Sequence, residues 1–109
     1  PYWEAQINIS SYLYAHSKKQ NDKQGMKKAY DFAFVCYNNL MRLSNGSFKN
    51  FYTKNPYLRE ASKVLLPMEI EQNRHADRIN LLLSSIEENS DDMERLKEFP
   101  LLQFSAYYA

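Results

Sequence analysis

Residues 56–88, PYLREASKVLLPMEIEQNRHADRINLLLSSIEE, decide the fold. Apolar residues return every three or four positions along this stretch, which is the period of one helix face. The apolar members of this seam are Leu58, Ala61, Leu65, Met68, Ile79, Leu82 and Ile86, and its polar members are Gln72 and His75. Asn55 and Pro56 have the chemistry of a helix start. The pattern predicts one long helix, kinked near Pro67 because a proline removes a hydrogen bond and clashes one turn back.

Two amphipathic segments come before this stretch. Residues 2–19 predict a helix with an apolar stripe of Tyr2, Ala5, Ile9, Tyr12, Leu13 and His16, widened by Trp3 and Ile7. Residues 26–44 predict a second helix. One of its faces carries Ala29, Phe32, Ala33, Cys36, Leu40 and Leu43, and the adjacent face carries Met26, Tyr30, Phe34, Tyr37 and Met41. A helix with so wide an apolar arc is expected to lie centrally in a bundle.

The connections are polar or carry helix-ending residues. Gly25 ends the first polar gap and is free to take a positive φ, and Gly46 is expected to end the second helix. Ser47 is expected to cap a short turn that places Phe48 and Phe51 on the core.

The last short helix begins with Asp91 and Glu94, which are spaced as a capping pair. Met93, Leu96 and Phe99 form its apolar side, and Pro100 is expected to stop it. The whole chain therefore predicts an all-α fold in a single helical domain over residues 1–109. We expect a small antiparallel bundle of three main helices plus one or two short ones.

The last ten residues, 100–109, read PLLQFSAYYA and carry no charge. Such a tail either folds back over its own bundle or presents an apolar strip to a partner. The predicted partner-binding residues are Leu101, Leu102, Phe104, Tyr107 and Tyr108, with Tyr2 and Trp3 as a second contact. Tyrosine and tryptophan are favoured at interfaces because they combine apolar area with a polar group.

The net charge of +1 conceals an asymmetry. Residues 1–66 carry a net charge of +6 and residues 67–109 a net charge of −5. A basic cluster of Lys18, Lys19, Lys23, Lys27 and Lys28 suits nucleic acid, together with the aromatic residues Phe48, Phe51, Tyr52 and Tyr57. The alternative is that basic and acidic helices lie side by side and neutralise each other.

Signatures of enzymes are scarce. Two isolated glycines exclude a phosphate-binding glycine loop, and the single cysteine, Cys36, fits buried packing in a reducing compartment. Glu71 and His75 share a helix face, but a metal site there would need His16 from the first helix. The simpler alternative places His75 in the seam and makes Glu71, together with Arg74, Asp77 and Arg78, part of a solvated charged face. We expect no metal and no cofactor.

The sequence favours a non-enzymatic helical module that binds another protein, of the adaptor, chaperone, inhibitor or immunity type. The polar positions of the seam also suggest self-association, as a homodimer in which the seam faces a second copy. The alternative function is a small nucleic-acid-binding accessory or regulatory factor that uses the Lys18–Lys28 cluster. With no apolar run of membrane-spanning length and no secretory signal in the sequence given, a cytoplasmic location without membrane contact is expected.

Overall fold

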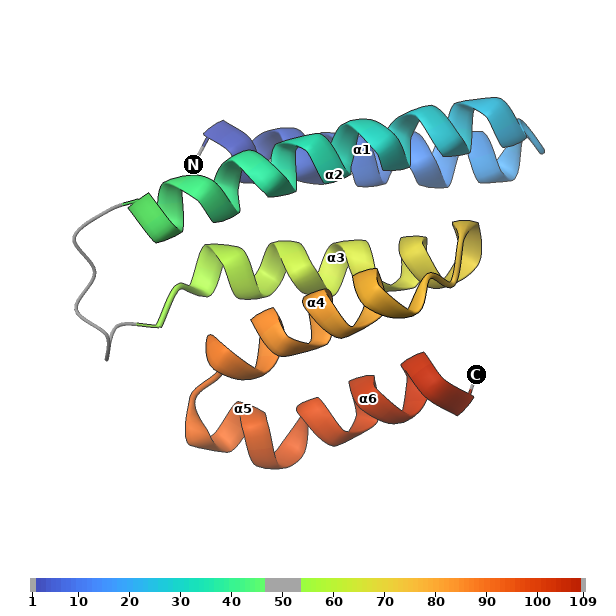
Figure 1. Cartoon of the computed structure of the whole chain (residues 1–109). Helices are drawn as coiled ribbons and strands as arrows, with labels where there is room; N and C mark the ends of the chain where they lie inside the picture. The colour runs from blue at the N-terminus through green and yellow to red at the C-terminus, as the bar shows by residue number, and fades with distance from the viewer. Residues whose placement is uncertain (1, 47–53, 109) are drawn as a thin grey trace.

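The computed structural model describes residues 2–46 and 54–108, which form helices joined by short turns, and no strand occurs there. The helices are α1 (Tyr2–Lys19), α2 (Lys23–Gly46), α3 (Pro56–Gln72), α4 (Ala76–Glu88), α5 (Asp92–Lys97) and α6 (Phe99–Tyr108). Figure 1 shows three layers: α1 and α2 form one edge, α3 and α4 the middle, and α5 and α6 the opposite edge. The all-α prediction is confirmed for these residues. None of their helices is long and apolar enough to cross a membrane.

The turn between α1 and α2 is made by Asn21 and Asp22. Asn21 takes the left-handed conformation, with a φ of 54°, which asparagine tolerates better than most residues. The Asp22 carboxylate accepts a 2.9 Å hydrogen bond from the N–H of Gly25, inside the first turn of α2. Gly25 therefore lies in the helix and does not use the positive φ that a glycine is free to take. Its role is steric, because a Cβ there would lie 2.5 Å from Asp22 Oδ2 and from Ser17 Oγ.

The predicted long third helix is two helices. α3 continues through Pro67, and the chain turns instead at Asn73, Arg74 and His75. The N–H groups of Asn73 and Arg74 donate to the Glu69 carbonyl at 2.9 and 2.8 Å, and Arg74 has a φ of 49°. A left-handed residue at this place reverses the chain, as it does at the C-terminal end of many helices. The kink predicted near Pro67 stays a prediction.

The apolar seam explains why the chain turns there. Its apolar members Leu58, Ala61, Leu65, Met68, Ile79, Leu82 and Ile86 are all buried. Gln72 is half-buried and His75 is exposed, so the prediction that these two polar residues lie within the seam is wrong. One continuous helix would have carried both through the apolar interface. The turn instead leaves them at the edge, and the two apolar halves pack on each other as α3 and α4.

α1 buries a different face from the predicted one. The side chains that face the core are Trp3, Ile7, Ser10 and Tyr14. The predicted stripe of Tyr2, Ala5, Ile9, Tyr12, Leu13 and His16 faces solvent, although Ile7 and Trp3, which were expected to widen it, do pack inward. Both sets recur at helical spacing, because α1 carries apolar side chains on two sides. Contacts with α3 select the buried side, since the Tyr14 hydroxyl donates to Glu71 at 2.5 Å.

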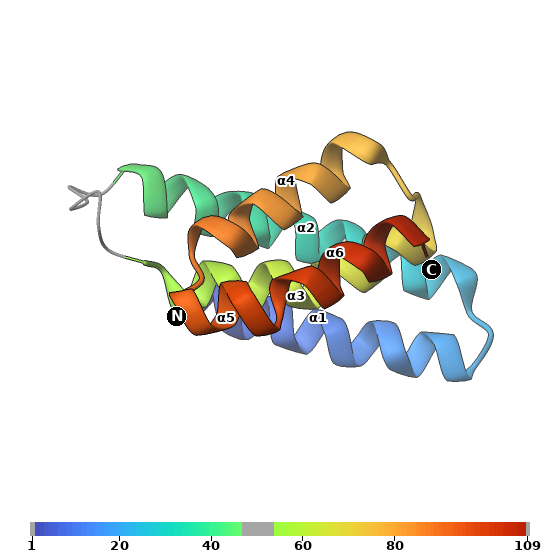
Figure 2. The ribbon, with the colours of Figure 1, turned by 90° about the horizontal axis from the view of Figure 1, so that it is seen from below.

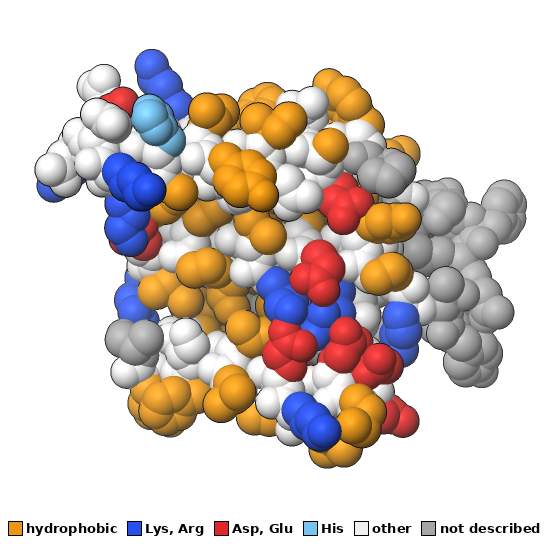
Figure 3. Space-filling view, turned by 180° about the vertical axis from the view of Figure 1, so that it is seen from behind, with side chains coloured by type: hydrophobic (Ala, Val, Ile, Leu, Met, Phe, Trp, Pro, Cys, Tyr) orange, Lys and Arg blue, Asp and Glu red, His pale blue; other side chains and the backbone are white. Residues whose placement is uncertain are grey.

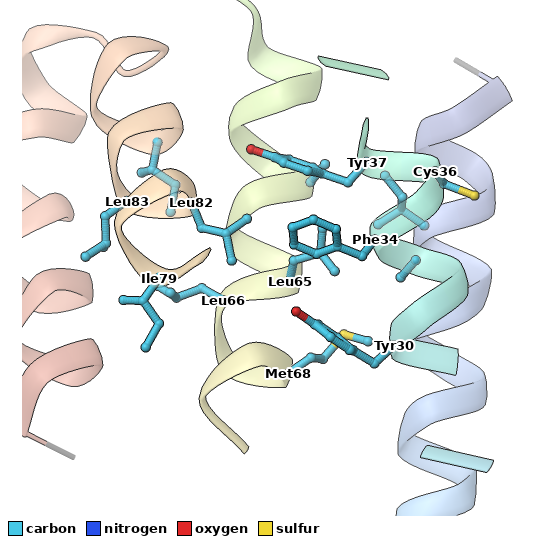
Figure 4. Close-up of a cluster of buried hydrophobic side chains, with 14 of the residues drawn as sticks. Tyr30, Phe34, Cys36, Tyr37, Leu65, Leu66, Met68, Ile79, Leu82 and Leu83 are labelled. Atoms are coloured by element: carbon cyan, nitrogen blue, oxygen red, sulfur yellow. The ribbon is translucent and has the colours of Figure 1, made fainter. Parts of the chain in front are cut away.

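α2 packs against both α1 and α3, which agrees with its wide apolar arc. Tyr30, Phe34 and Tyr37 point toward α3, where they meet Leu65 and Met68 (Figure 4). These five side chains are buried and form the centre of the core. The middle layer is thus fixed on one side by three aromatic rings.

The outer side of α2 differs from the prediction. Phe32 and Leu43, both expected in the core, are at least half exposed, and so is Val35 between them. The predicted turn at Ser47 with Phe48 lies outside the described residues, as does Phe51.

The last layer begins with the predicted capping box. The Asp91 carboxylate accepts from the Glu94 N–H, and the Glu94 carboxylate accepts from the Asp91 N–H, both at 2.8 Å. Met93 and Leu96 are exposed, so their predicted packing is wrong. The predicted short helix, α5, ends at Lys97, before Pro100. Pro100 itself falls in the first turn of α6, where its missing N–H costs no hydrogen bond.

Candidate functional site

α6 attaches to the bundle by one apolar face. Phe99 and Ala106 are buried, and Leu102 packs against the same core. Arg74, in the turn between α3 and α4, donates a 3.2 Å hydrogen bond to the Ala106 carbonyl. Figure 2 shows α6 running along the underside of the middle layer, and α6 contacts both α3 and α4. Of the two alternatives for the tail, the described residues adopt the one in which it docks on its own chain.

The opposite face of α6 is apolar as well. Leu101, Phe104 and Tyr108 follow one another at helical spacing and expose 71, 64 and 76% of their surface. The rings of Phe104 and Tyr108 stack with their centroids 5.0 Å apart. Tyr107 lies beside them, half exposed, and its hydroxyl donates to Asn80 of α4. Leu101, Phe104, Tyr107 and Tyr108 are named the α6 strip below.

An open pocket of ≈ 310 Å³ runs along the α6 strip. Its lining residues are Pro100, Gln103, Phe104, Tyr107 and Tyr108. No residue of α6 is charged. A side chain entering this pocket would therefore meet apolar surface and the amide and hydroxyl groups of its rim, and no ion. Such a surface suits an apolar or aromatic side chain of another protein.

The structure separates the predicted partner-binding residues. Leu102 packs inward, away from the α6 strip. Tyr2 and Trp3 stand at the start of α1, in the edge layer opposite α6 (Figure 1). Their rings are 4.8 Å apart in an edge-on arrangement, and Trp3 packs against the core while Tyr2 is exposed. These two residues and the α6 strip therefore do not form one continuous surface.

The predicted basic cluster lies around the turn between α1 and α2. Lys18 pairs with Glu71 at 2.7 Å, and Lys27 pairs with Asp31 at 2.8 Å. The other members, Lys19, Lys23 and Lys28, are exposed and form no ion pair within the described part of the chain.

The aromatic residues predicted to join this cluster are not beside it. Tyr57 is in the first turn of α3, at the end of the molecule away from the α1–α2 turn (Figure 1). Phe48, Phe51 and Tyr52 lie outside the described residues. The combination of lysines and stacking rings is thus not assembled at the α1–α2 turn by the residues that the structure describes.

Arg59 joins the two oppositely charged halves of the chain. Its side chain is 3% exposed, and its Nη atoms lie 3.1 Å from a Glu94 oxygen and 2.7 Å from a Glu98 oxygen. Arg59 Nε also donates to Ser90 at 3.0 Å, and Lys63 pairs with Glu98. Figure 3 shows acidic and basic side chains gathered in the middle of one face. The expectation that basic and acidic helices neutralise each other describes these residues well.

A second polar cluster ties α2, α3 and α4 together. Glu69 is fully buried, and its Oε2 accepts hydrogen bonds of 3.0 Å from Tyr30 and from Asn73. The Arg78 guanidinium lies 4.4 Å from the centre of the Phe34 ring and donates to the Tyr30 hydroxyl. Burial raises the pKa of Tyr30 to about 12, with Glu69 contributing. The prediction that Arg78 belongs to a solvated charged face is therefore wrong.

The residues considered for metal or nucleophilic chemistry have other roles. Among the described residues, no three histidine, cysteine, aspartate or glutamate side chains are placed to hold a metal ion. Lys18 and Tyr14 hold the pKa of Glu71 below its ordinary value, and His75 is exposed. Burial raises the pKa of the Cys36 thiol, which disfavours the reactive thiolate.

Sequence reasoning missed the exposed apolar side of α1 and α2, because it assigned Ile9, Leu13 and Phe32 to the core. The available signal was the presence of two apolar seams on α1 where one is enough for packing.

Comparisons with protein-family models, with curated proteins and with solved structures found no match for this chain.

Proposed function

We propose that the protein is a non-enzymatic helical module that binds another protein through the α6 strip. One observation carries this proposal: α6 is already docked on its own bundle and still presents Leu101, Phe104 and Tyr108 to solvent. A terminal helix that only covered the core would need one apolar face, with polar residues on the other. Exposed, contiguous apolar side chains of this size are typical of protein interaction sites.

The experiment replaces the outward side chains and leaves the inward ones in place. Deleting residues 101–109 would also remove Leu102 and Ala106 from the core, so it would confuse folding with binding. The triple variant Leu101→Ser, Phe104→Ser, Tyr108→Ser changes only exposed side chains. Immobilised wild-type and variant proteins are compared for the proteins that they retain from an extract of the cells that make the protein.

The control variant is Tyr12→Ser, which removes an equally exposed ring from α1. The proposal expects a discrete protein to be retained by the wild type and by the control and lost by the triple variant. Retention of the same protein by the triple variant would show that the α6 strip is not the binding surface.

The second candidate function, nucleic-acid binding, is supported by Lys19, Lys23 and Lys28, which lie exposed around one turn. Phosphate contacts of this kind give an affinity that falls steeply as salt rises. A titration with single- and double-stranded oligonucleotides at two salt concentrations tests it. A Lys19→Ala, Lys23→Ala, Lys28→Ala variant should then lose the salt-dependent binding, and binding that is unchanged in this variant would remove the candidate.

A further inference from the structure

α1 carries two parallel seams, and folding of the chain uses only one. The inner seam is Trp3, Ile7, Ser10 and Tyr14, which faces the core. The outer seam is Tyr2, Gln6, Ile9 and Leu13, at the same alternation of three and four residues. Tyr2, Ile9 and Leu13 are each at least half exposed. A helix that is apolar on two adjacent sides normally packs on more than one neighbour, yet the outer seam of α1 lies at an edge of the molecule (Figure 1).

α2 repeats this arrangement beside α1. Its inner faces pack on α1 and α3, and Phe32, Val35, Asn39 and Leu43 recur along its outer side. Phe32, Val35 and Leu43 are each at least half exposed. Hydrophobic side chains gather along the edge of the molecule that this helix pair forms, as the upper margin of Figure 3 shows. Tyr2, Ile9, Leu13, Phe32, Val35 and Leu43 are named the hairpin face below.

The size of the hairpin face is that of one side of a small dimer interface. Six large side chains that each expose half or more of their surface, at roughly 200 Å² for a whole side chain, amount to about 600 Å². The half-buried Gln6 and Asn39 between them add polar area. A stable interface of ordinary size takes about 800 Å² from each partner. The hairpin face therefore offers most of the area that a dimer of this chain requires.

The centre of the hairpin face suits a second copy as the occupant. The residues that form the two outer seams are uncharged, although Arg42, beside Leu43, is exposed and donates to Asn39. In a two-fold interface each patch meets itself, so any charge near its centre would face its own like charge. Arg42 lies toward the end of the α2 seam, so the centre of the hairpin face holds no charge that opposes self-pairing.

We propose that two copies of this chain associate through their hairpin faces, so that α1 and α2 of each copy form a four-helix layer. The alternation of three and four residues in both outer seams is the spacing that packs helices nearly in line in four-helix bundles. Gln6 and Asn39 are the polar positions of the two seams, of the kind that sets register in helical interfaces. The seam of α3 and α4, which the sequence suggested for this role, is buried within one chain.

Sedimentation equilibrium of the wild-type protein is the first test. Because interfaces of ordinary size bind with Kd values from micromolar to picomolar, a sample at about 100 µM should be dimeric. The expected mass is twice the 12.9 kDa of the single chain. A mass of 12.9 kDa at this concentration would overturn the proposal.

Substitutions on the hairpin face locate the interface. The double variant Ile9→Lys, Phe32→Lys changes two half-exposed side chains, so it should keep the helix content of the wild type by circular dichroism. It should be monomeric at the same concentration, because lysines of both copies would face each other. The matched control is Leu96→Lys on α5, which is exposed in the opposite layer and should stay dimeric.

A charge-swap experiment separates lost association from lost structure, because a variant that has unfolded could not recover the dimer on mixing. The second double variant is Ile9→Glu, Phe32→Glu, and mixing it with the lysine variant places opposite charges across the interface whichever helices meet. The mixture should recover the dimeric mass, while each variant alone stays monomeric. A lysine variant that remains dimeric, a mixture that does not associate, or loss of the dimer in Leu96→Lys would each contradict the proposal.

Discussion

The two edge layers of the molecule are attached to the middle layer in different ways. The α1–α2 hairpin is attached mainly by burial, because Ile7, Tyr30, Phe34 and Tyr37 insert large side chains toward the core. The α5–α6 layer buries less, and no residue of α5 is buried at all. An ion network between α3 and the start of this layer is added to the apolar contacts of Phe99, Leu102 and Ala106. The difference teaches that one edge depends mainly on packing, whereas charge contributes a larger share at the other.

Removing an aromatic ring from the hairpin should have the largest effect. Phe34→Ala deletes a buried ring that also supports the Arg78 guanidinium, and we expect a loss of about 3–5 kcal/mol in the free energy of unfolding. Phe32→Ala, two residues away, deletes a half-exposed ring and should change this free energy by less than about 0.5 kcal/mol in the monomer. Urea denaturation measures both. Equal losses in the two variants would mean that α2 does not bury the face that carries Phe34.

Breaking the ion network should have the next largest effect and should act on the other edge. Arg59→Met removes the buried guanidinium that Glu94 and Glu98 share, and we expect a loss of about 2 kcal/mol, because hydrogen bonds to charged groups are lost while the partly exposed carboxylates regain water. Lys63→Met removes a partly exposed partner of Glu98, and about 0.5–1 kcal/mol should be lost. Denaturation of both variants beside the wild type gives the difference. The charge-based account of the α5–α6 layer fails if Arg59→Met is as stable as the wild type.

Alkaline pH should weaken the hairpin. Burial, reinforced by Glu71 at one site and by Glu69 at the other, raises the pKa of both Tyr14 and Tyr30 from 10.0 to about 12. A group whose pKa is raised on folding contributes stability that is complete below its unfolded pKa and is lost as the pH rises through its folded pKa. Stability should therefore fall between about pH 10 and pH 12. Urea denaturation across this range should show a shallower fall in Tyr14→Phe. An identical fall in that variant would contradict the assignment.

Acid should have the smallest effect, and it should act on both edges. Lys63 and Arg59 lower the pKa of Glu98, and Lys18 and Tyr14 lower that of Glu71. A carboxylate whose pKa is lowered on folding contributes stability that is present above its unfolded pKa of 4.5 and is lost as the pH falls through its folded pKa.

Denaturation below pH 4.5 distinguishes the two carboxylates. Glu98→Gln should flatten the acid dependence more than Glu71→Gln, because two cations hold Glu98 and one holds Glu71. A larger effect of Glu71→Gln would contradict the view that ion pairing contributes more at the α5–α6 edge than at the α1–α2 edge.

Local chemistry allowed much of the fold to be predicted. The bounds of α1 at residues 2–19 agree with the prediction, and Asn55 caps α3 through a 3.1 Å hydrogen bond from the Leu58 N–H. The Asp91 and Glu94 capping box also forms as predicted. These features depend on residues within one helical turn of each other, so a single sequence contains the information.

Features that depend on tertiary contacts were not predictable from spacing alone. The turn at Arg74 interrupts a seam that stays in phase on both sides, and only packing of α3 on α4 shows why. The choice between the two seams of α1 depends on its contacts with α2 and α3, among them the hydrogen bond of Tyr14 with Glu71. At the candidate site, the apolar tail was predicted, but the division of α6 into the buried Ala106 side and the exposed Phe104 side was not.

The central claim is that α6 is docked on its own chain and that its layer is held by the Arg59 network. Hydrogen exchange of wild type and Arg59→Met, followed by mass spectrometry, tests this claim most directly. In the wild type, residues 99–108 should be protected from exchange well beyond an unstructured peptide. In Arg59→Met this protection should fall over residues 92–108, while residues 23–43 keep theirs. Rapid exchange of residues 99–108 in the wild type, or an equal loss in both segments of the variant, would contradict the account.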